Sequence, residues 1–153
     1  MTLKQHAVGS ALAGAGFFAL TQSWEGTLVC FLSGIFIDLD HVLDYCVIKK
    51  KMCNYRELVD FCFDQSGQVF LFLHSFEMLA VLWVLFFLYG MPVILGGLGL
   101  GLSVHLILDQ IGNPVSPLAY FIFYRWKLGF PKTIFFKNIT PEILKRNYDE
   151  HFR

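Results

Sequence analysis

The sequence predicts an all-α membrane protein whose core is a bundle of four transmembrane helices. Hydrophobic residues make up 56% of the 153 residues and charged residues only 16%, which is more apolar than is usual for a soluble domain of this size. The apolar residues also gather into four segments, at about 7–21, 27–48, 69–88 and 93–111. The last two segments approach the ~20 residues that cross a bilayer, and the first two are read as tilted or polar-ended spans.

Short turns separate the segments within each pair. Thr21–Gly26 connects the first segment to the second, and Tyr89–Pro92 connects the third to the fourth. The aromatic stretch Pro117–Trp126 predicts an interfacial helix, because Tyr and Trp favour the headgroup level of a membrane. Thr140 followed by Pro141 and an acidic residue is typical of a helix N-terminus, so we expect a short C-terminal cytoplasmic helix.

The basic residues predict the orientation of the bundle. Of the twelve Lys and Arg residues, one precedes the first segment, four lie between the second and third, and seven follow the fourth. The positive-inside rule places that side in the cytoplasm, so we expect an inner-membrane protein with both termini cytoplasmic. The membrane bundle takes residues 1–126 and the cytoplasmic tail residues 127–153. A cleaved signal peptide is the alternative for the N-terminus, but no small-residue cleavage site follows Leu20.

Charge and cysteine content exclude two further classes of protein. The formal net charge is zero, so the chain has no overall basicity for binding nucleic acid. The four cysteines contain no C-x-x-C pair, which favours free thiols in a reducing compartment over a disulfide framework. These cysteines are Cys30, Cys46, Cys53 and Cys62.

Ionisable side chains recur at the cytoplasmic ends of the apolar segments. Each costs about 2.5–3.5 kcal/mol in hydrocarbon, so we expect a bound metal ion to hold them there. Their spacings of three and four residues place partners on one helix face. The orientation was derived from Lys and Arg alone. The placement of the His, Asp and Glu residues at one level of the bundle is therefore independent support for a shared site. The predicted metal ligands are His6, Asp38, Asp40, His41, His74, His105 and Asp109.

Imidazole and carboxylate donors without a thiolate suit Zn²⁺, with Mn²⁺ or Fe²⁺ as alternatives. Similar donors inside helix bundles hold two-ion centres, so we expect two ions. Glu77 and Asp44 are the candidate catalytic bases or ligand-orienting groups. Arg125 and Lys127 are the candidate substrate-binding cations for an anionic head group. A single His in a helix is often only structural, and His151 in the polar tail is read in that way.

The order of these residues resembles the YdjM-like family of membrane-bound metal-dependent hydrolases. The resemblance covers about residues 5–130, and it departs from the family pattern at Ile37 and Leu73, where Pro and Thr are usual, and in lacking an Arg upstream of His74. It implies a metal-dependent hydrolase that is distantly similar to zinc phospholipase C. The matching elements are His6, Gly34-Ile-Phe-Ile-Asp38-Leu-Asp40-His41, Leu73-His74-Ser75, Gly101-Leu-Ser-Val-His105-Leu-Ile-Leu-Asp109 and the proline-containing loop 110–117.

Three functions follow from these observations. The first is hydrolysis of a phosphoester in a lipid head group by a metal-activated water, with membrane lipid as the partner. The second is a non-catalytic membrane protein with a structural metal site and a partner-binding tail. The third, a metal or proton carrier, needs polar groups on both sides of the midplane, and the outer halves of the segments are nearly devoid of them. The glycines of 96–101 are expected to pack within the bundle rather than between protomers.

Overall fold

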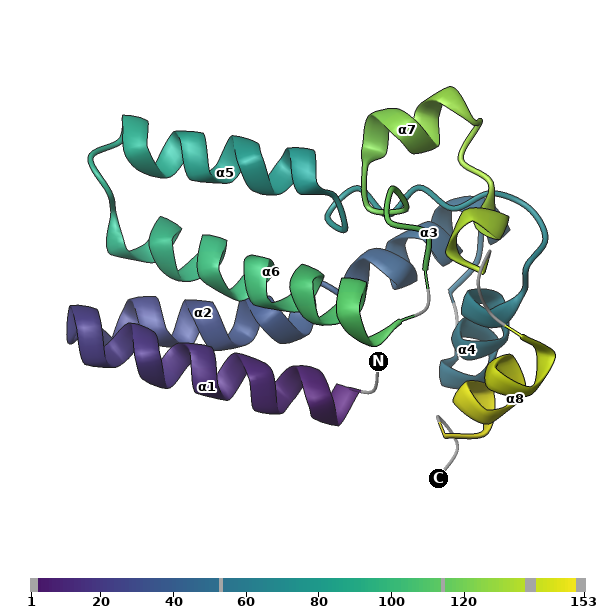
Figure 1. Ribbon diagram of the computed structural model, residues 1–153, viewed down its shortest axis with the longest axis horizontal. Helices are drawn as coiled ribbons and strands as arrows, with labels where there is room; N and C mark the ends of the chain where they lie inside the picture. The colour runs from purple at the N-terminus through teal and green to yellow at the C-terminus, as the bar shows by residue number, and fades with distance from the viewer. Residues whose placement is uncertain (1–2, 53, 114, 137–139, 151–153) are drawn as a thin grey trace. The chain divides into compact units, whose positions relative to one another are not determined.

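The computed structural model describes residues 3–52, 54–113, 115–136 and 140–150 (Figure 1). Within these residues every regular element is a helix, apart from one isolated bridge between Gln68 and Pro131. The predicted all-α class is therefore confirmed. The chain divides into two compact units, each built from two separated stretches of sequence. Unit 1 is the chain up to Ile37 with Leu73–Asn113, and unit 2 is Asp38–Phe72 with the chain after Asn113.

Unit 1 consists of four helices joined as two hairpins, and α6 packs against the other three (Figure 1). Ser23 caps the second helix by accepting a hydrogen bond from the Gly26 N–H, and Ser75 caps the third by accepting one from Met78. The two connections fall at the predicted turns. The helices are α1 (Leu3–Thr21), α2 (Trp24–Phe36), α5 (Phe76–Leu88) and α6 (Val93–Gly112).

Glycines bring the backbones of α2 and α6 into contact. A Cβ atom at Gly97 would lie 2.2 Å from the Gly26 carbonyl oxygen, and one at Gly101 would lie 2.2 Å from the Cys30 carbonyl oxygen. No side chain fits at either position, so the glycines pack inside unit 1, as the sequence predicted. His105 follows Gly101 by one helical turn and is therefore held close to α2.

The structure does not support four full-length membrane spans. Within the part of the chain that the structure describes, one helix, α6, is long and apolar enough to cross a bilayer, and a second qualifies only if α2 and α3 (Leu39–Lys49) count as one interrupted span. Helix α5 has 13 residues, which is about 20 Å and short of the ~30 Å hydrocarbon core. The apolar stretch 69–75, which was expected to lengthen α5, is not helical.

Unit 2 contains shorter helices than unit 1. The second predicted segment does not continue as one helix, because a turn at Ile37 and Asp38 interrupts it before α3. The C-terminal helix is confirmed, and Thr140 accepts a hydrogen bond from the Ile143 N–H at its start. The helices of unit 2 are α3, α4 (Tyr55–Phe63), α7 (Ile122–Lys127), the 3₁₀ helix η1 (Lys132–Phe135) and α8 (Pro141–Glu150).

Residues 64–72 of unit 2 are not helical. Two charged side chains form hydrogen bonds with the backbone of this irregular stretch. Asp44 Oδ2 accepts hydrogen bonds from the N–H groups of Phe70 at 2.5 Å and Leu71 at 3.1 Å. The Arg125 guanidinium donates to the carbonyl oxygens of the same two residues, at 2.5 and 3.0 Å. Leu71 has a positive φ of 46°. Buried backbone groups that no helix satisfies therefore find their partners in these side chains.

Candidate metal centre

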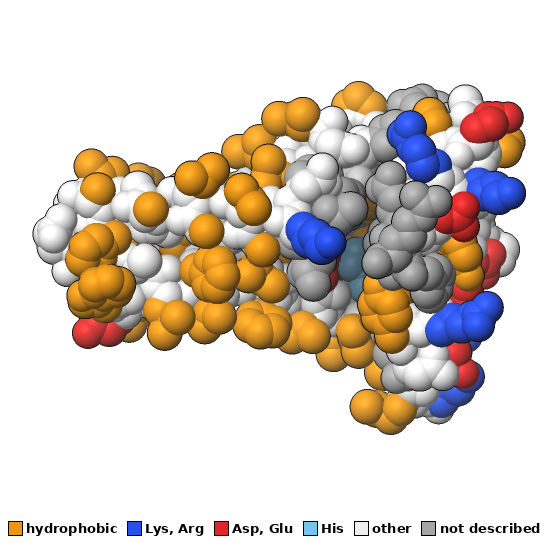
Figure 2. All heavy atoms as spheres, turned by 90° about the horizontal axis from the view of Figure 1, so that it is seen from below, with side chains coloured by type: hydrophobic (Ala, Val, Ile, Leu, Met, Phe, Trp, Pro, Cys, Tyr) orange, Lys and Arg blue, Asp and Glu red, His pale blue; other side chains and the backbone are white. Residues whose placement is uncertain are grey.

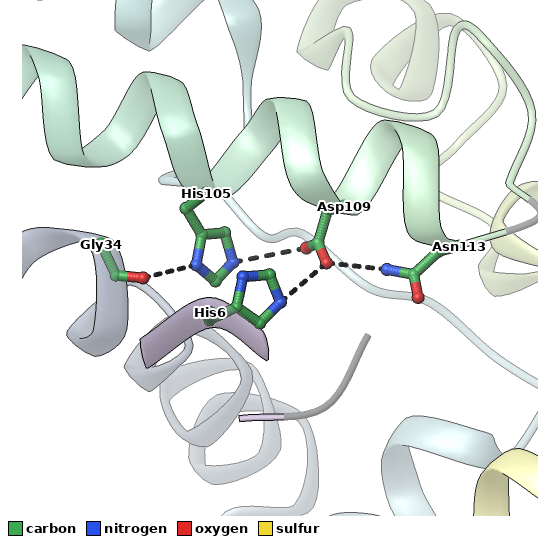
Figure 3. Close-up of polar contacts among 5 residues, drawn as sticks. All are labelled: His6, Gly34, His105, Asp109 and Asn113. Atoms are coloured by element: carbon green, nitrogen blue, oxygen red, sulfur yellow. Dashed lines mark hydrogen bonds and ion pairs between the residues drawn. The ribbon is translucent and has the colours of Figure 1, made fainter. Parts of the chain in front are cut away.

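Three ionisable side chains of unit 1 converge on one point (Figure 3). His6 comes from the first turns of α1, while His105 and Asp109 lie four residues apart on α6. Nε2 of His6 lies 3.1 Å from Asp109 Oδ1, and Nε2 of His105 lies 3.3 Å from Asp109 Oδ2. The relative exposures are 3% for His6, 0% for His105 and 6% for Asp109. The three groups therefore face one another and not bulk water.

A backbone carbonyl fixes the proton on His105. Nδ1 of His105 lies 2.8 Å from the Gly34 carbonyl oxygen, as Figure 3 shows. Because a carbonyl oxygen can only accept, Nδ1 carries the proton. In the neutral ring, Nε2 then directs a lone pair at the Asp109 carboxylate. Two lone pairs facing each other at this distance repel, unless a proton or a metal cation lies between them.

The absence of a side chain at Gly34 lets α1, α2 and α6 approach at this point. A Cβ atom there would lie 2.2 Å from Ser10 Oγ and 3.3 Å from the Gly101 carbonyl oxygen. Ser10 follows His6 by four residues on α1, so this contact also sets the position of the His6 ring. The rings of His6 and His105 stack with centroids 3.9 Å apart and planes 14° from parallel.

Asn113 orients the carboxylate of the cluster. Its Nδ2 donates a hydrogen bond to Asp109 Oδ1 at 2.8 Å, from one turn further along the chain (Figure 3). The carboxylate thus has one neighbour from each of three directions: two imidazoles and an amide. Hydrogen bonds of this kind commonly hold metal-binding carboxylates in position.

The donor distances fit a divalent metal ion. Two tetrahedral zinc bonds of about 2.0–2.2 Å place a nitrogen and an oxygen donor about 3.4 Å apart, close to the two separations from Asp109. Nδ1 of His6 is buried and has no hydrogen-bond partner among the described residues, so the protein alone does not satisfy that ring. Two imidazoles and one carboxylate also leave coordination positions open for further ligands. The His6, His105 and Asp109 cluster can therefore hold a metal ion.

Two more predicted residues belong to unit 1. His74 is 1% exposed, and its ring meets the His105 ring edge to face with centroids 5.2 Å apart. It therefore lies beside the cluster, immediately before the Ser75 cap of α5. Glu77 is half-buried in the first turn of α5.

Four predicted metal-site or catalytic residues belong to unit 2. Asp38 stands at the N-cap of α3, and Asp40 and Asp44 are buried along that helix. His41 is half-buried, with Nδ1 3.7 Å from Cys62 Sγ. The expectation that these residues share one centre with the residues of unit 1 stays a prediction.

The two predicted substrate-binding cations lie in different surroundings. Arg125 is 0% exposed and its guanidinium binds the carbonyls of Phe70 and Leu71. Lys127, two residues later on α7, is exposed. Of this pair, Lys127 is the side chain that is open to a ligand from solvent, whereas Arg125 stabilises the irregular stretch of unit 2.

Sequence reasoning missed two contributors to the cluster. Asn113 follows Asp109 by four residues, so the helical spacing that singled out His105 could also have found it. The Gly34 carbonyl is a backbone group, and its role carries no side-chain signal. Cys30, Cys46 and Cys62 form no disulfide in the described part of the chain, as expected, and Cys53 lies outside the described residues.

Comparison of the chain with family models, with characterised proteins and with solved structures finds no match. The resemblance to the YdjM-like family therefore rests on the order and spacing of the motifs. The chemistry of the site has to be argued from its own residues.

Proposed function

We propose that the protein is a membrane-bound, metal-dependent hydrolase that cleaves a phosphoester of a lipid head group. The observation that carries this proposal is the buried cluster in which two imidazole nitrogens point at the Asp109 carboxylate. This donor set suits Zn²⁺, and also Mn²⁺ or Fe²⁺. When bound, such an ion supplies a Lewis acid that polarises the phosphoester and makes a water molecule more acidic. We propose two ions, as in other carboxylate–histidine helix bundles.

The residues around the cluster prepare it for this role. The Gly34 carbonyl keeps the proton of His105 on Nδ1, so that Nε2 keeps a free lone pair that can bind a metal ion. Asn113 holds the Asp109 carboxylate in one orientation. These contacts fix the donors before any ligand arrives, which lowers the cost of assembling the site.

Glu77 is the better of the two candidate bases. It lies in unit 1, the unit that contains the cluster, and is half-buried near the start of α5. Asp44 instead accepts two backbone hydrogen bonds through Oδ2 and supports Phe70 and Leu71. A carboxylate that takes the proton of an attacking water needs an accessible oxygen, so we assign this step to Glu77.

The outer surface of unit 1 supports a membrane location. On the face drawn in Figure 2, charged side chains gather over unit 2, while the helices of unit 1 carry mostly apolar side chains. We propose that unit 1 lies in the inner membrane as a short four-helix bundle with both termini cytoplasmic, and that its short helices tilt or thin the bilayer. Its exposed apolar residues include Val8, Leu12, Leu28, Val81, Phe87 and Ile94.

A structural metal site is the second candidate function. The deep burial of His6, His105 and Asp109 favours it, because closed structural sites keep their donors away from solvent. In this case a chelator would lower the melting temperature of the protein, and no lipid would be hydrolysed by the metal-loaded form.

The proposed activity can be tested by head-group release. Detergent-purified protein loaded with Zn²⁺ or Mn²⁺ is mixed with phospholipid vesicles, and phosphorylated head groups are measured in the soluble fraction. We expect release by the wild type, loss of release in Asp109→Asn, and retention in Glu25→Gln, which removes an exposed carboxylate of α2. Release that survives in Asp109→Asn would contradict the proposal, as would a metal-loaded wild type without activity.

A further inference from the structure

Helix α3 of unit 2 carries apolar side chains on its outer face and carboxylates on its inner face. Leu39, Leu43 and Val47 follow one another at intervals of four residues, so they form one stripe along the helix, the α3 stripe. Their relative exposures are 52%, 57% and 65%. Asp40 and Asp44 are instead buried. A surface helix of a soluble protein has the opposite pattern, so the α3 stripe marks a contact with something other than water.

Contacts inside unit 2 fix which face of α3 is turned outward. The ring of Tyr45 meets the ring of Phe61 on α4 edge to face, with centroids 5.4 Å apart. The Tyr45 hydroxyl also donates a hydrogen bond of 2.8 Å to Oε2 of Glu57. The preceding residue, Asp44, accepts two backbone hydrogen bonds from the irregular stretch. Turning the α3 stripe inward would break all of these contacts, so its exposure is a property of the folded unit.

A run of basic residues lies at the C-terminal end of the α3 stripe. Lys49–Lys51 are all exposed, and no acidic residue occurs in the sequence between Asp44 and Glu57. Lys51 forms an ion pair with Glu57 at 3.1 Å. Met52, which follows the lysines, is 83% exposed. Apolar side chains next to lysines match a membrane surface, because lysine stems lie along apolar groups while their ammonium groups reach anionic head groups.

The length of α3 is too small for this helix to cross a bilayer by itself. Its 11 residues extend about 16 Å, roughly half of the ~30 Å hydrocarbon core. The α3 stripe begins at the first residue of the helix, Leu39, and extends to Val47, two residues before its end. The whole stripe therefore contacts lipid when the helix lies along the membrane surface.

We infer that α3 lies in the plane of the membrane, with the α3 stripe among the acyl chains and with Lys49 and Lys50 binding the head groups of anionic phospholipids. The inference goes beyond the proposed function, which concerns unit 1 and the reaction at its metal centre. Unit 2 then has its own contact with the membrane.

The competing arrangement is a membrane span that continues from α2 into α3. Eight residues separate Leu39 from Val47, so a span would place them at depths that differ by up to about 12 Å. An in-plane helix places both at the same depth. A protein partner would instead cover the α3 stripe and keep lipid away from it. Depth and lipid contact at these two positions therefore distinguish the three arrangements.

The test is quenching of single tryptophans by brominated phospholipids in the full chain, reconstituted into vesicles of phosphatidylcholine and phosphatidylglycerol. Leu39→Trp and Val47→Trp are each introduced into a chain whose three native tryptophans are replaced by phenylalanine. We expect both to be quenched to the same degree, and more strongly by bromine near the carbonyl end of the acyl chain than near its methyl end. Arg146→Trp, at an exposed position of α8, is the matched control and should not be quenched.

The role of the lysines is measured in the same vesicles with Val47→Trp. At equal mole fraction, brominated phosphatidylglycerol should quench about twofold more strongly than brominated phosphatidylcholine. Replacing both Lys49→Gln and Lys50→Gln should remove this preference. The control pair Lys145→Gln and Arg146→Gln removes the same charge from exposed positions of α8 and should keep the preference. Far-ultraviolet circular dichroism checks that each variant is folded.

Three results would overturn the inference. No quenching at Leu39→Trp and Val47→Trp, in vesicles where a chain that retains only Trp24 of unit 1 is quenched, would assign the α3 stripe to a protein partner and leave the proposed membrane location of unit 1 intact. Different depths at the two positions would make α3 part of a span. Equal quenching by the two lipids would remove the binding of anionic head groups.

Discussion

The buried charges of the two units have different partners. In unit 1, the side chains of His6, His105 and Asp109 face one another. In unit 2, the buried Asp44 and Arg125 face backbone N–H and carbonyl groups. Burial alone therefore does not mark a functional site. A charged side chain that forms hydrogen bonds with backbone groups stabilises the fold. Side chains whose metal-binding atoms face one another can instead coordinate an ion.

The two units also differ in how their backbones are held in close contact. Unit 1 brings the backbones of α2 and α6 together through glycines. Unit 2 contains an irregular stretch whose peptide groups cannot bond within a helix. The side chains of Asp44 and Arg125 form hydrogen bonds with these groups instead.

Replacing Arg125 should give the largest loss of stability. Arg125→Met leaves the carbonyls of Phe70 and Leu71 without their guanidinium donor and removes the positive charge near Asp44. We expect the free energy of unfolding to fall by about 3–5 kcal/mol, as when a buried charged partner is removed. Lys127→Met, at an exposed position two residues later, should change it by about 0.5 kcal/mol or less. Denaturant unfolding measures both, and equal effects would contradict the role of Arg125.

Adding a methyl group at Gly101 should open the contact between α2 and α6. Gly101→Ala places a Cβ 2.2 Å from the Cys30 carbonyl oxygen, so the two backbones must separate. We expect a loss of about 1–3 kcal/mol together with weaker metal binding, because His105 moves away from Gly34. At Gly16 on α1 a Cβ meets nothing within 4 Å, and Gly16→Ala should instead stabilise the helix by about 0.5–1 kcal/mol. A stable Gly101→Ala variant would show that the helices are not in backbone contact.

Removing the amide of Asn113 should appear mainly in metal affinity rather than in the free energy of unfolding. Asn113→Ala leaves the three donors in place but releases one constraint on Asp109. We expect metal affinity to fall about 10- to 100-fold, as for other residues that orient a metal-binding carboxylate. Competition with a chromogenic chelator measures this change. Asn147→Ala on α8 is the matched control and should bind metal as the wild type does; a wild-type affinity in Asn113→Ala would remove the orienting role.

The sequence predicted the cluster because its residues follow helical spacing. His105 and Asp109 are four residues apart, and the turns that reverse the chain bring the start of α1 to the same end of unit 1 as the end of α6. The start of α5 at Phe76 was not predicted, although Ser75 is a strong N-cap residue followed by Glu77 in the first turn. What spacing could not show is the Gly34 carbonyl, because it belongs to the backbone.

The fold of the third predicted segment could not be read locally. Val69 to Phe72 are apolar and continue the hydrophobic pattern of α5, so they were expected to be helical. Their peptide groups bond instead to Asp44, about 26 residues earlier, and to Arg125, about 55 residues later. Bonds over such separations override local preference. Arg125 lies in an aromatic stretch typical of a membrane interface, so it was expected to bind substrate. Its long-range bonds to Phe70 and Leu71 instead bury its side chain.

His6, His105 and Asp109 of unit 1 are proposed to hold a metal ion. This proposal is tested most directly by elemental analysis of the detergent-purified wild type beside Asp109→Asn and Glu25→Gln, each purified without chelator. We expect Asp109→Asn to retain one metal ion fewer per chain than the wild type, and Glu25→Gln to retain the same number. A wild type without metal, or an Asp109→Asn variant with the full wild-type content, would contradict it.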